Sequence, residues 1–255
     1  MSGYAWILRP IVWFTAASMV TTIVHEFTHA SVAYVLGVRS TLFSYFVDLD
    51  LAQASATIPR RAVIGVSGPL ICLALGVLAW LAFRRTRHSA AALPLLYLTL
   101  FGIATFFGNL MSIAFVGDFS SVALMLHVPM GLRYLLTAIG ALGVAAMHFW
   151  AGRELVRLVP ARVGAMRAML CIVALPALLG TVAIVLVNQP MPWSRASVRF
   201  TEAGFWLFAA VGALAARRRL HNDADHLTLR WADGAVLLLA VSIVRVMVPG
   251  ITFTP

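Results

Sequence analysis

The chain is dominated by stretches of about 20 apolar residues that are separated by short polar segments. A stretch of that length is what an α-helix needs to cross the hydrocarbon core of a bilayer. The composition agrees, because 62% of the 255 residues are hydrophobic and only 11% are charged, whereas soluble domains carry about 25% charged residues. These values exclude a soluble globular enzyme, a disordered chain and a disulfide-rich secreted module. The sequence therefore predicts an all-α polytopic membrane protein.

Seven apolar runs predict about seven transmembrane helices. The third run is longer than one regular crossing and contains Gly108, Asn109, Gly117 and Asp118. We expect its helix to unwind near these residues, and non-helical backbone at membrane depth is tolerated only beside protein or a water-filled cavity. The expected spans cover residues 10–37, 62–83, 93–128, 132–152, 168–188, 201–216 and 231–249.

The net charge of +10 comes entirely from an excess of arginine, since the chain contains no lysine. Arginines gather in the loops at residues 84–87, 153–167 and 217–230, and the positive-inside rule then places the N-terminus in the cytoplasm. We interpret the charge as membrane-surface loops of a multi-pass protein in a bacterial or archaeal cell membrane, with no nucleic acid as a partner. Cys72 and Cys171 lie in apolar runs and support neither a disulfide framework nor a thiolate metal site.

The first apolar run contains the H-E-x-x-H motif His25-Glu26-Phe27-Thr28-His29. On a helix, positions i and i+4 share a face, so His25 and His29 can each direct a nitrogen at one metal ion. Glu26 is placed to take a proton from water on that metal. Interhelical hydrogen bonds from two histidines are the alternative reading, but they account for neither the spacing nor the glutamate.

A catalytic zinc site usually has three protein ligands and an open position for water. Asp118 is the only acidic residue inside the apolar part of another early span, so we expect it to be the third ligand. His127 and His148 are the next candidates. The polar run at residues 221–226 also carries histidines and aspartates, but we interpret it as a solvated loop.

Three elements within residues 10–128 resemble the site-2 proteases, which are intramembrane zinc metalloproteases. The first is the H-E-x-x-H motif. The second is Ser67-Gly68-Pro69-Leu70, which is similar to the small-residue Gly-Pro element of that family's next core helix. The third is an asparagine, Asn109, followed by Asp118 on an irregular third helix. The chain departs from the family pattern at Ser112, at Phe119 and in an asparagine–aspartate spacing that is one residue longer.

The resemblance implies one Zn²⁺ per chain that is held by His25, His29 and Asp118. It implies that Glu26 is the catalytic base and that Asn109 binds the oxyanion or the substrate backbone. It also implies that Gly68 and Pro69 have a structural role near the site, although ordinary helix packing explains these two residues equally well. The implied activity is that of a hydrolase, an intramembrane zinc metalloendopeptidase that cleaves membrane-protein substrates in or near their transmembrane segment.

On this reading residues 1–128 form the metalloprotease core with three spans, and residues 129–255 form accessory transmembrane helices without a recognised motif. Residues 46–51 partly alternate as a strand does. The resemblance implies a short membrane-associated β-hairpin at residues 40–59, whose edge pairs with an extended substrate; an amphipathic loop is equally compatible. The expected partners are the membrane-protein substrate, the lipid bilayer and, as regulator, a separate membrane protein.

Two other functions stay open on the sequence alone. A non-catalytic zinc-binding membrane scaffold, or an inactive protease relative, fits the departures at Ser112 and Phe119. A membrane zinc hydrolase of a lipid or small molecule uses the same ligands, although the hairpin favours a peptide. The side of the membrane is also open, because the arginines place the site outside whereas bacterial members of the family place theirs toward the cytoplasm.

Overall fold

The computed structural model describes residues 5–53, 55–87, 89–159, 163–216, 227 and 229–255. Six of its helical segments are long and apolar enough to cross a membrane. They correspond to the first six predicted spans. The polar run at residues 221–226 lies outside the described residues.

Four of these segments are single helices, and two are composite. The single helices are α1 (Ala5–Val35), α2 (Ile58–Arg85), α3 (Ala92–Met111) and α5 (Met130–Arg157). The composite segments are α6 (Ala165–Met169) with the π-helical turn η1 (Leu170–Ala174) and α7 (Leu175–Val187), and α8 (Trp193–Gly204) with α9 (Trp206–Ala215). The predicted seventh span corresponds to α10 (Trp231–Met247), which has 17 residues, so a seventh crossing stays a prediction.

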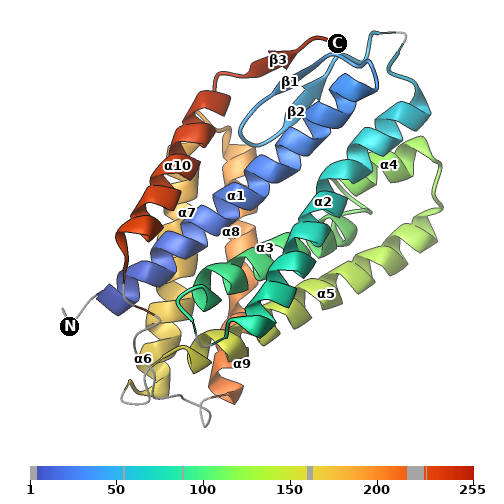
Figure 1. Ribbon diagram of the computed structural model, residues 1–255. Coiled ribbons are helices and arrows are strands. Elements are labelled where there is room, and N and C mark those ends of the chain that lie inside the picture. The colour runs from blue at the N-terminus through green and yellow to red at the C-terminus, as the bar shows by residue number, and fades with distance from the viewer. Residues whose placement is uncertain (1–4, 54, 88, 160–162, 217–226, 228) are drawn as a thin grey trace.

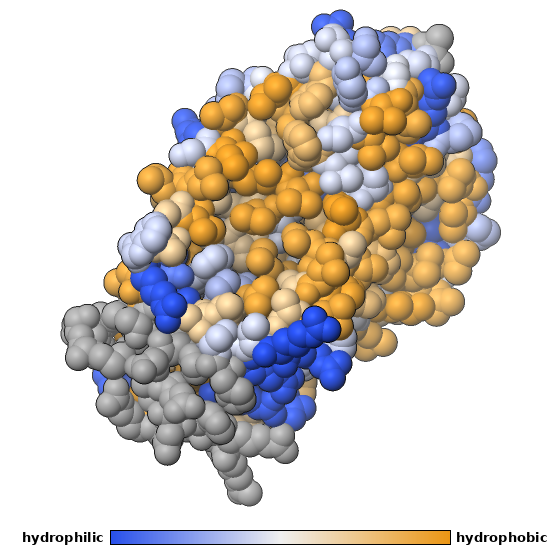
Figure 2. All heavy atoms as spheres, in the orientation of Figure 1, coloured by the Kyte–Doolittle hydropathy of each residue, from blue (hydrophilic) through white to orange (hydrophobic). Residues whose placement is uncertain are grey.

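The surface of the bundle is apolar along its middle and hydrophilic toward its two ends (Figure 2). Large apolar side chains point outward there, and Leu78, Leu142 and Leu207 are 65%, 72% and 73% exposed. A soluble monomer rarely exposes contiguous apolar surface on this scale. The fold is therefore that of a multi-pass membrane protein.

The interior is shared by both halves of the chain. Phe14 of α1 contacts Tyr97 and Phe101 of α3 and Trp206 of α9, with ring centroids 5.0 to 6.0 Å apart. The same apolar cluster reaches α10 at Val244. The helices of the predicted metalloprotease core and the predicted accessory helices thus pack together. The division of the chain into a catalytic part, residues 1–128, and an accessory part, residues 129–255, stays a prediction.

The third predicted run is broken where we expected it to be. The helix α3 ends at Met111, turns occupy residues 112–117, and the short helix α4 (Asp118–Met125) follows. Gly117 precedes α4 with a φ of 104°, a left-handed conformation that glycine adopts without steric cost. Asp118 consequently begins a short helix beside the bundle.

A small antiparallel sheet lies at the end of the bundle where α1 ends and α2 begins (Figure 1). The central strand β1 (Ser40–Leu42) pairs with β2 (Val47–Leu49) on one side and with β3 (Ile251–Phe253) on the other. Leu42 is buried against Ala30 of α1 and Met247 of α10, so the sheet packs next to the H-E-x-x-H segment. The third strand, from the C-terminal segment, was not predicted, and the association of the sheet with the membrane stays a prediction.

Two arginines that the sequence interpretation placed in surface loops are buried. Arg9 is 2% exposed, and its Nε donates to Asp233 Oδ2 at 2.8 Å. Arg133 is 7% exposed and donates to the connection between α3 and α4. Buried cations are costly unless they are bonded, so these two side chains join helices to one another. The cytoplasmic N-terminus stays a prediction.

Candidate metal centre

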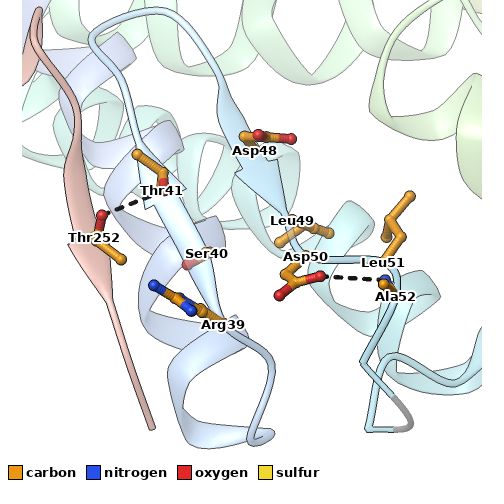
Figure 3. Close-up of a pocket in the computed structure, with 9 residues that line it drawn as sticks. All are labelled: Arg39, Ser40, Thr41, Asp48, Leu49, Asp50, Leu51, Ala52 and Thr252. Atoms are coloured by element: carbon orange, nitrogen blue, oxygen red, sulfur yellow. Dashed lines mark hydrogen bonds between the residues drawn. The ribbon is translucent and has the colours of Figure 1, made fainter.

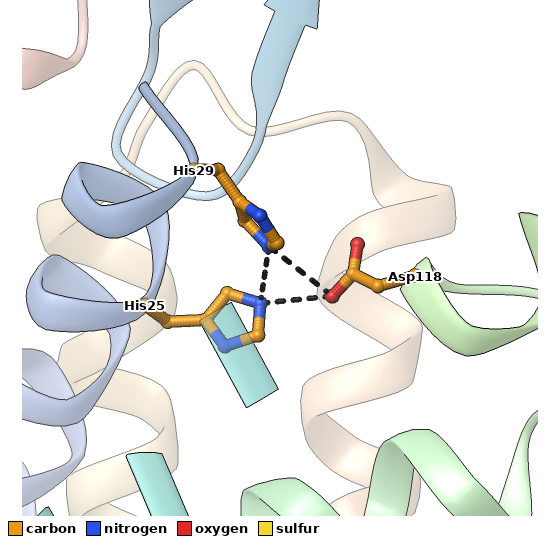
Figure 4. A group of neighbouring side chains, drawn as sticks. All are labelled: His25, His29 and Asp118. Carbon is orange, nitrogen blue, oxygen red and sulfur yellow. Dashed lines mark hydrogen bonds and ion pairs between the residues drawn. The ribbon is translucent and has the colours of Figure 1, made fainter. Parts of the chain in front are cut away.

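Three side chains that can bind a metal converge close to the sheet end of the bundle (Figure 4). His25 and His29 lie on successive turns of α1, and Asp118 reaches them from α4. Asp118 Oδ2 is 2.9 Å from His25 Nε2 and 3.4 Å from His29 Nε2, and the two Nε2 atoms are 3.1 Å apart. The structure therefore brings together the three residues predicted as ligands, and the described part of the chain holds no other such group of three.

The donor set fits a zinc ion in both chemistry and spacing. Two imidazole nitrogens and a carboxylate oxygen are common zinc ligands at about 2.0–2.2 Å, and tetrahedral ligands at that distance lie about 3.3 Å apart. The three separations of 2.9, 3.1 and 3.4 Å between the ligand atoms fall around this value. Both histidines are buried, whereas the Asp118 side chain is 31% exposed, so the group is least covered by protein on the α4 side.

The ring of His29 is oriented by a backbone carbonyl of α2. Its Nδ1 lies 2.6 Å from the carbonyl oxygen of Ile64, and because a carbonyl only accepts, Nδ1 must carry the proton. The lone pair of Nε2 is then free for a metal ion. Ser67 Oγ donates to the same carbonyl at 2.7 Å. Such an outer hydrogen bond is the usual way in which a protein fixes a ligating histidine.

Cys72 of α2 is the outer neighbour of His25. Its Sγ lies 3.7 Å from the carbonyl oxygen of Thr21 and 3.6 Å from His25 Nδ1. A thiol that donates to the carbonyl leaves its sulfur to accept from Nδ1–H. The lone pair of His25 Nε2 is then available to a metal ion between His25 and Asp118. The sequence interpretation gave Cys72 no role, because nothing local relates it to a histidine on another helix.

Two glycines on α2 let the neighbouring elements approach. A Cβ at Gly68 would overlap the His29 ring, so the ring sits where a side chain would otherwise be. Pro69 follows inside the helix and lacks the N–H that would bond the carbonyl of Gly65. A Cβ at Gly65 would come within 2.7 Å of Val122 on α4. Gly65 was missed by sequence reasoning, although a second glycine one turn before Gly68 was visible.

Glu26 lies next to the group but takes no part in it. The residue is 9% exposed, and within the described residues its carboxyl group forms no hydrogen bond or ion pair. The charges that act on it belong to His25, His29, Asp118 and Arg199. Arg199 reaches this face of α1 from α8, where it donates to Thr22 Oγ1 at 3.4 Å and to Glu202 Oε2 at 3.1 Å.

The remaining predicted residues occupy different positions. Asn109 lies near the end of α3, where its Nδ2 donates to the carbonyl of Thr105 at 3.1 Å. His127 is exposed in the turn after α4. His148 is buried in α5, where its Nδ1 bonds the carbonyl of Val144 and its ring packs against Trp206. Neither histidine joins the group, so of the three candidates for the third ligand only Asp118 has the required position.

A separate polar pocket of about 470 Å³ lies on the small sheet (Figure 3). Thr41 of β1 faces Asp48 of β2 and Thr252 of β3 across the sheet, and Asp50 accepts from the backbone N–H of Ala52 at 3.3 Å. None of the three converging ligands lines this pocket. It is therefore distinct from the candidate metal centre.

The chain matches no protein-family model, and comparison with curated proteins and with solved structures finds no match. Assignment of a function therefore depends on the chemistry of the residues described above.

Proposed function

We propose that the chain is an intramembrane zinc metalloendopeptidase, similar to the site-2 proteases, that cleaves membrane-protein substrates in or near their transmembrane segments. The observation that carries the proposal is the convergence of His25, His29 and Asp118 inside a bundle of apolar helices. Ionisable residues at such a position are expensive and are functional candidates by default. Hydrolysis also requires a general base, and Glu26, which has no hydrogen-bond or ion-pair partner among the described residues, lies next to the three ligands.

The roles of the residues follow from their atoms. His25 and His29 bind the metal through Nε2, and Asp118 binds it through a carboxylate oxygen. A bound zinc ion supplies Lewis acidity, which acidifies water and polarises a carbonyl group. Glu26 accepts a proton from the attacking water on a carboxyl oxygen and later gives it to the leaving amine. Its lack of a partner among the described residues leaves both oxygens available for this transfer.

Two further parts of the structure support a peptide as the substrate. The Asn109 amide group has two N–H bonds and uses one of them on Thr105, so the other can bond a carbonyl oxygen of the substrate. In the sheet, β1 has a neighbour on both sides, so an extended peptide has to pair at an outer edge, of which β2 is one. Addition of a strand to such an edge is a known mode of peptide recognition.

The direct test of the activity is Glu26→Gln in the full chain. The variant should bind Zn²⁺ as the wild type does and leave membrane proteins uncut, because an amide cannot accept the proton. Membrane proteomes of the two strains should differ in the length of at least one protein. Glu202→Gln is the matched control, since Glu202 is exposed on α8. Identical proteomes in the wild-type and Glu26→Gln strains would contradict proteolysis and favour a zinc-binding scaffold.

Replacing Asp118 with alanine tests the third ligand. Loss of a ligand should weaken Zn²⁺ binding by more than the roughly 10–100-fold that outer-shell changes cost. Asp48→Ala, in the polar pocket of the sheet, removes an aspartate elsewhere and should leave the affinity unchanged. Unchanged zinc content in Asp118→Ala would exclude Asp118 as a ligand.

A further inference from the structure

The position of Asp118 depends on how α4 is anchored. This helix has only eight residues, and it follows the turns at residues 112–117, where the regular hydrogen bonds of α3 have ended. It contacts α2 at Val122, which packs against Gly65. Phe119 of α4 also contacts Phe106 of α3, with ring centroids 5.6 Å apart. Apolar packing of this kind is not directional, and polar contacts add the directional restraint on the segment that carries Asp118.

Those contacts come from Arg133 in the first turn of α5. Its Nε donates to the carbonyl oxygen of Ile113 at 3.0 Å, and its Nη2 donates to Ser120 Oγ at 3.3 Å. Ile113 lies before Asp118 in the turns, and Ser120 lies two residues after it in α4. A single guanidinium group therefore bonds the chain on both sides of Asp118.

The environment of Arg133 shows that this bridge is its main interaction. The side chain is 7% exposed and Ser120 is 2% exposed, so water does not compete for these bonds. No carboxylate forms an ion pair with Arg133 in the parts of the chain that the structure describes. A buried arginine is costly unless its N–H groups are bonded, and here the turns of a broken helix provide the acceptors.

We propose that Arg133 is the positioning residue of the metal centre, which holds the α3–α4 connection so that Asp118 points at the two imidazoles. The inference rests on the zinc site proposed above. Arg133 touches no ligand atom and acts only through Ile113 and Ser120. A planar guanidinium presents several N–H donors in a fixed fork and can bond two acceptors at once, which a lysine ammonium at the end of a flexible stem does less well.

The test is the affinity of the purified full chain for Zn²⁺, measured by competition with a chelating dye. Arg133→Met removes both hydrogen bonds and should weaken Zn²⁺ binding by about 4–100-fold, because each of the two bonds contributes about 2–10-fold. Arg133→Lys keeps the charge and should give an intermediate affinity. Arg245→Met is the matched control, because Arg245 also donates to two backbone carbonyls, those of Val187 and Gln189, at another place in the bundle. It should bind Zn²⁺ as the wild type does.

A second readout separates positioning from general stability. Co²⁺ bound in place of Zn²⁺ has an absorption spectrum that reports its ligands, and Arg133→Met should change it. A purely structural role would lower the unfolding midpoint of the metal-free chain but leave the affinity and the Co²⁺ spectrum of the folded protein unchanged, and that result would overturn the inference.

If Arg133→Met does not fold, Ser120→Ala removes one of the two hydrogen bonds and should weaken Zn²⁺ binding by about 2–10-fold. Wild-type Zn²⁺ affinity in Ser120→Ala would overturn the inference. A wild-type chain that binds no Zn²⁺ would refute the proposed function itself.

Discussion

Replacing Gly68 with alanine should damage the metal centre from the neighbouring helix. The added Cβ would overlap the His29 ring, with Cε1 at 2.7 Å and Cδ2 at 2.9 Å. The ring has to move, because the Cβ is fixed to the backbone of α2. That movement breaks the 2.6 Å contact between His29 Nδ1 and the Ile64 carbonyl oxygen. It also takes Nε2 away from Asp118.

The size of the effect follows from these contacts. Overpacking of this kind costs about 1–3 kcal/mol of folding free energy. The Ile64 carbonyl still accepts from Ser67 Oγ at 2.7 Å, so no unsatisfied acceptor adds to that cost. Loss of the bond that orients a ligating histidine weakens metal binding by about 10–100-fold, which corresponds to about 1.4–2.7 kcal/mol of binding free energy.

Two measurements on the purified chain check this prediction, a Zn²⁺ competition titration and a denaturant unfolding curve. Gly108→Ala on α3 is the matched control, since a Cβ there meets no atom within 4 Å. The control should keep its zinc affinity and gain up to about 1 kcal/mol of stability from the better helix former. Wild-type zinc affinity in Gly68→Ala would refute the position of the His29 ring against α2.

Two further predictions concern the packing around the site and the buried ion pair. Gly65→Ala should push α4 away through Val122 and weaken Zn²⁺ binding in the same titration, and Val122→Ala in addition should restore it; a double variant that stays weak would contradict this contact. Asp233→Asn removes one partner of the buried Arg9–Asp233 ion pair and should cost about 3–5 kcal/mol of stability, seen as a lower unfolding midpoint. Glu202→Gln, at an exposed ion pair, should cost at most about 1 kcal/mol, and equal shifts in these two variants would contradict a structural role of the buried pair.

The helices and the ligands were predictable because both depend on local spacing. The thickness of a bilayer sets the length of an apolar run, and the predicted span at residues 132–152 lies inside the observed helix Met130–Arg157. His25 and His29 share a face through the geometry of a single helix. Asp118 was predictable because acidic residues are rare in apolar runs, and the glycines around it indicated the break.

Contacts between distant segments were not predictable in this way. Arg133 bonds a carbonyl 20 residues earlier in the chain, and its position near the start of an apolar run suggested only a loop at the membrane surface. The strand β3 joins β1 from the other end of the chain. Cys72 and Gly65 lie beside the site because α2 packs against α1 and α4. Such pairings depend on the three-dimensional arrangement of helices, which apolar periodicity does not specify.

The most direct test of the proposed metal centre is X-ray absorption at the zinc edge, measured on the purified full chain. We predict one zinc ion per chain with two imidazole neighbours and only nitrogen or oxygen ligands, at about 2.0–2.2 Å. A sulfur neighbour at about 2.3 Å would instead place Cys72, whose Sγ is 3.6 Å from His25 Nδ1, among the ligands. That result, or a chain that binds no zinc, would contradict a site formed by His25, His29 and Asp118.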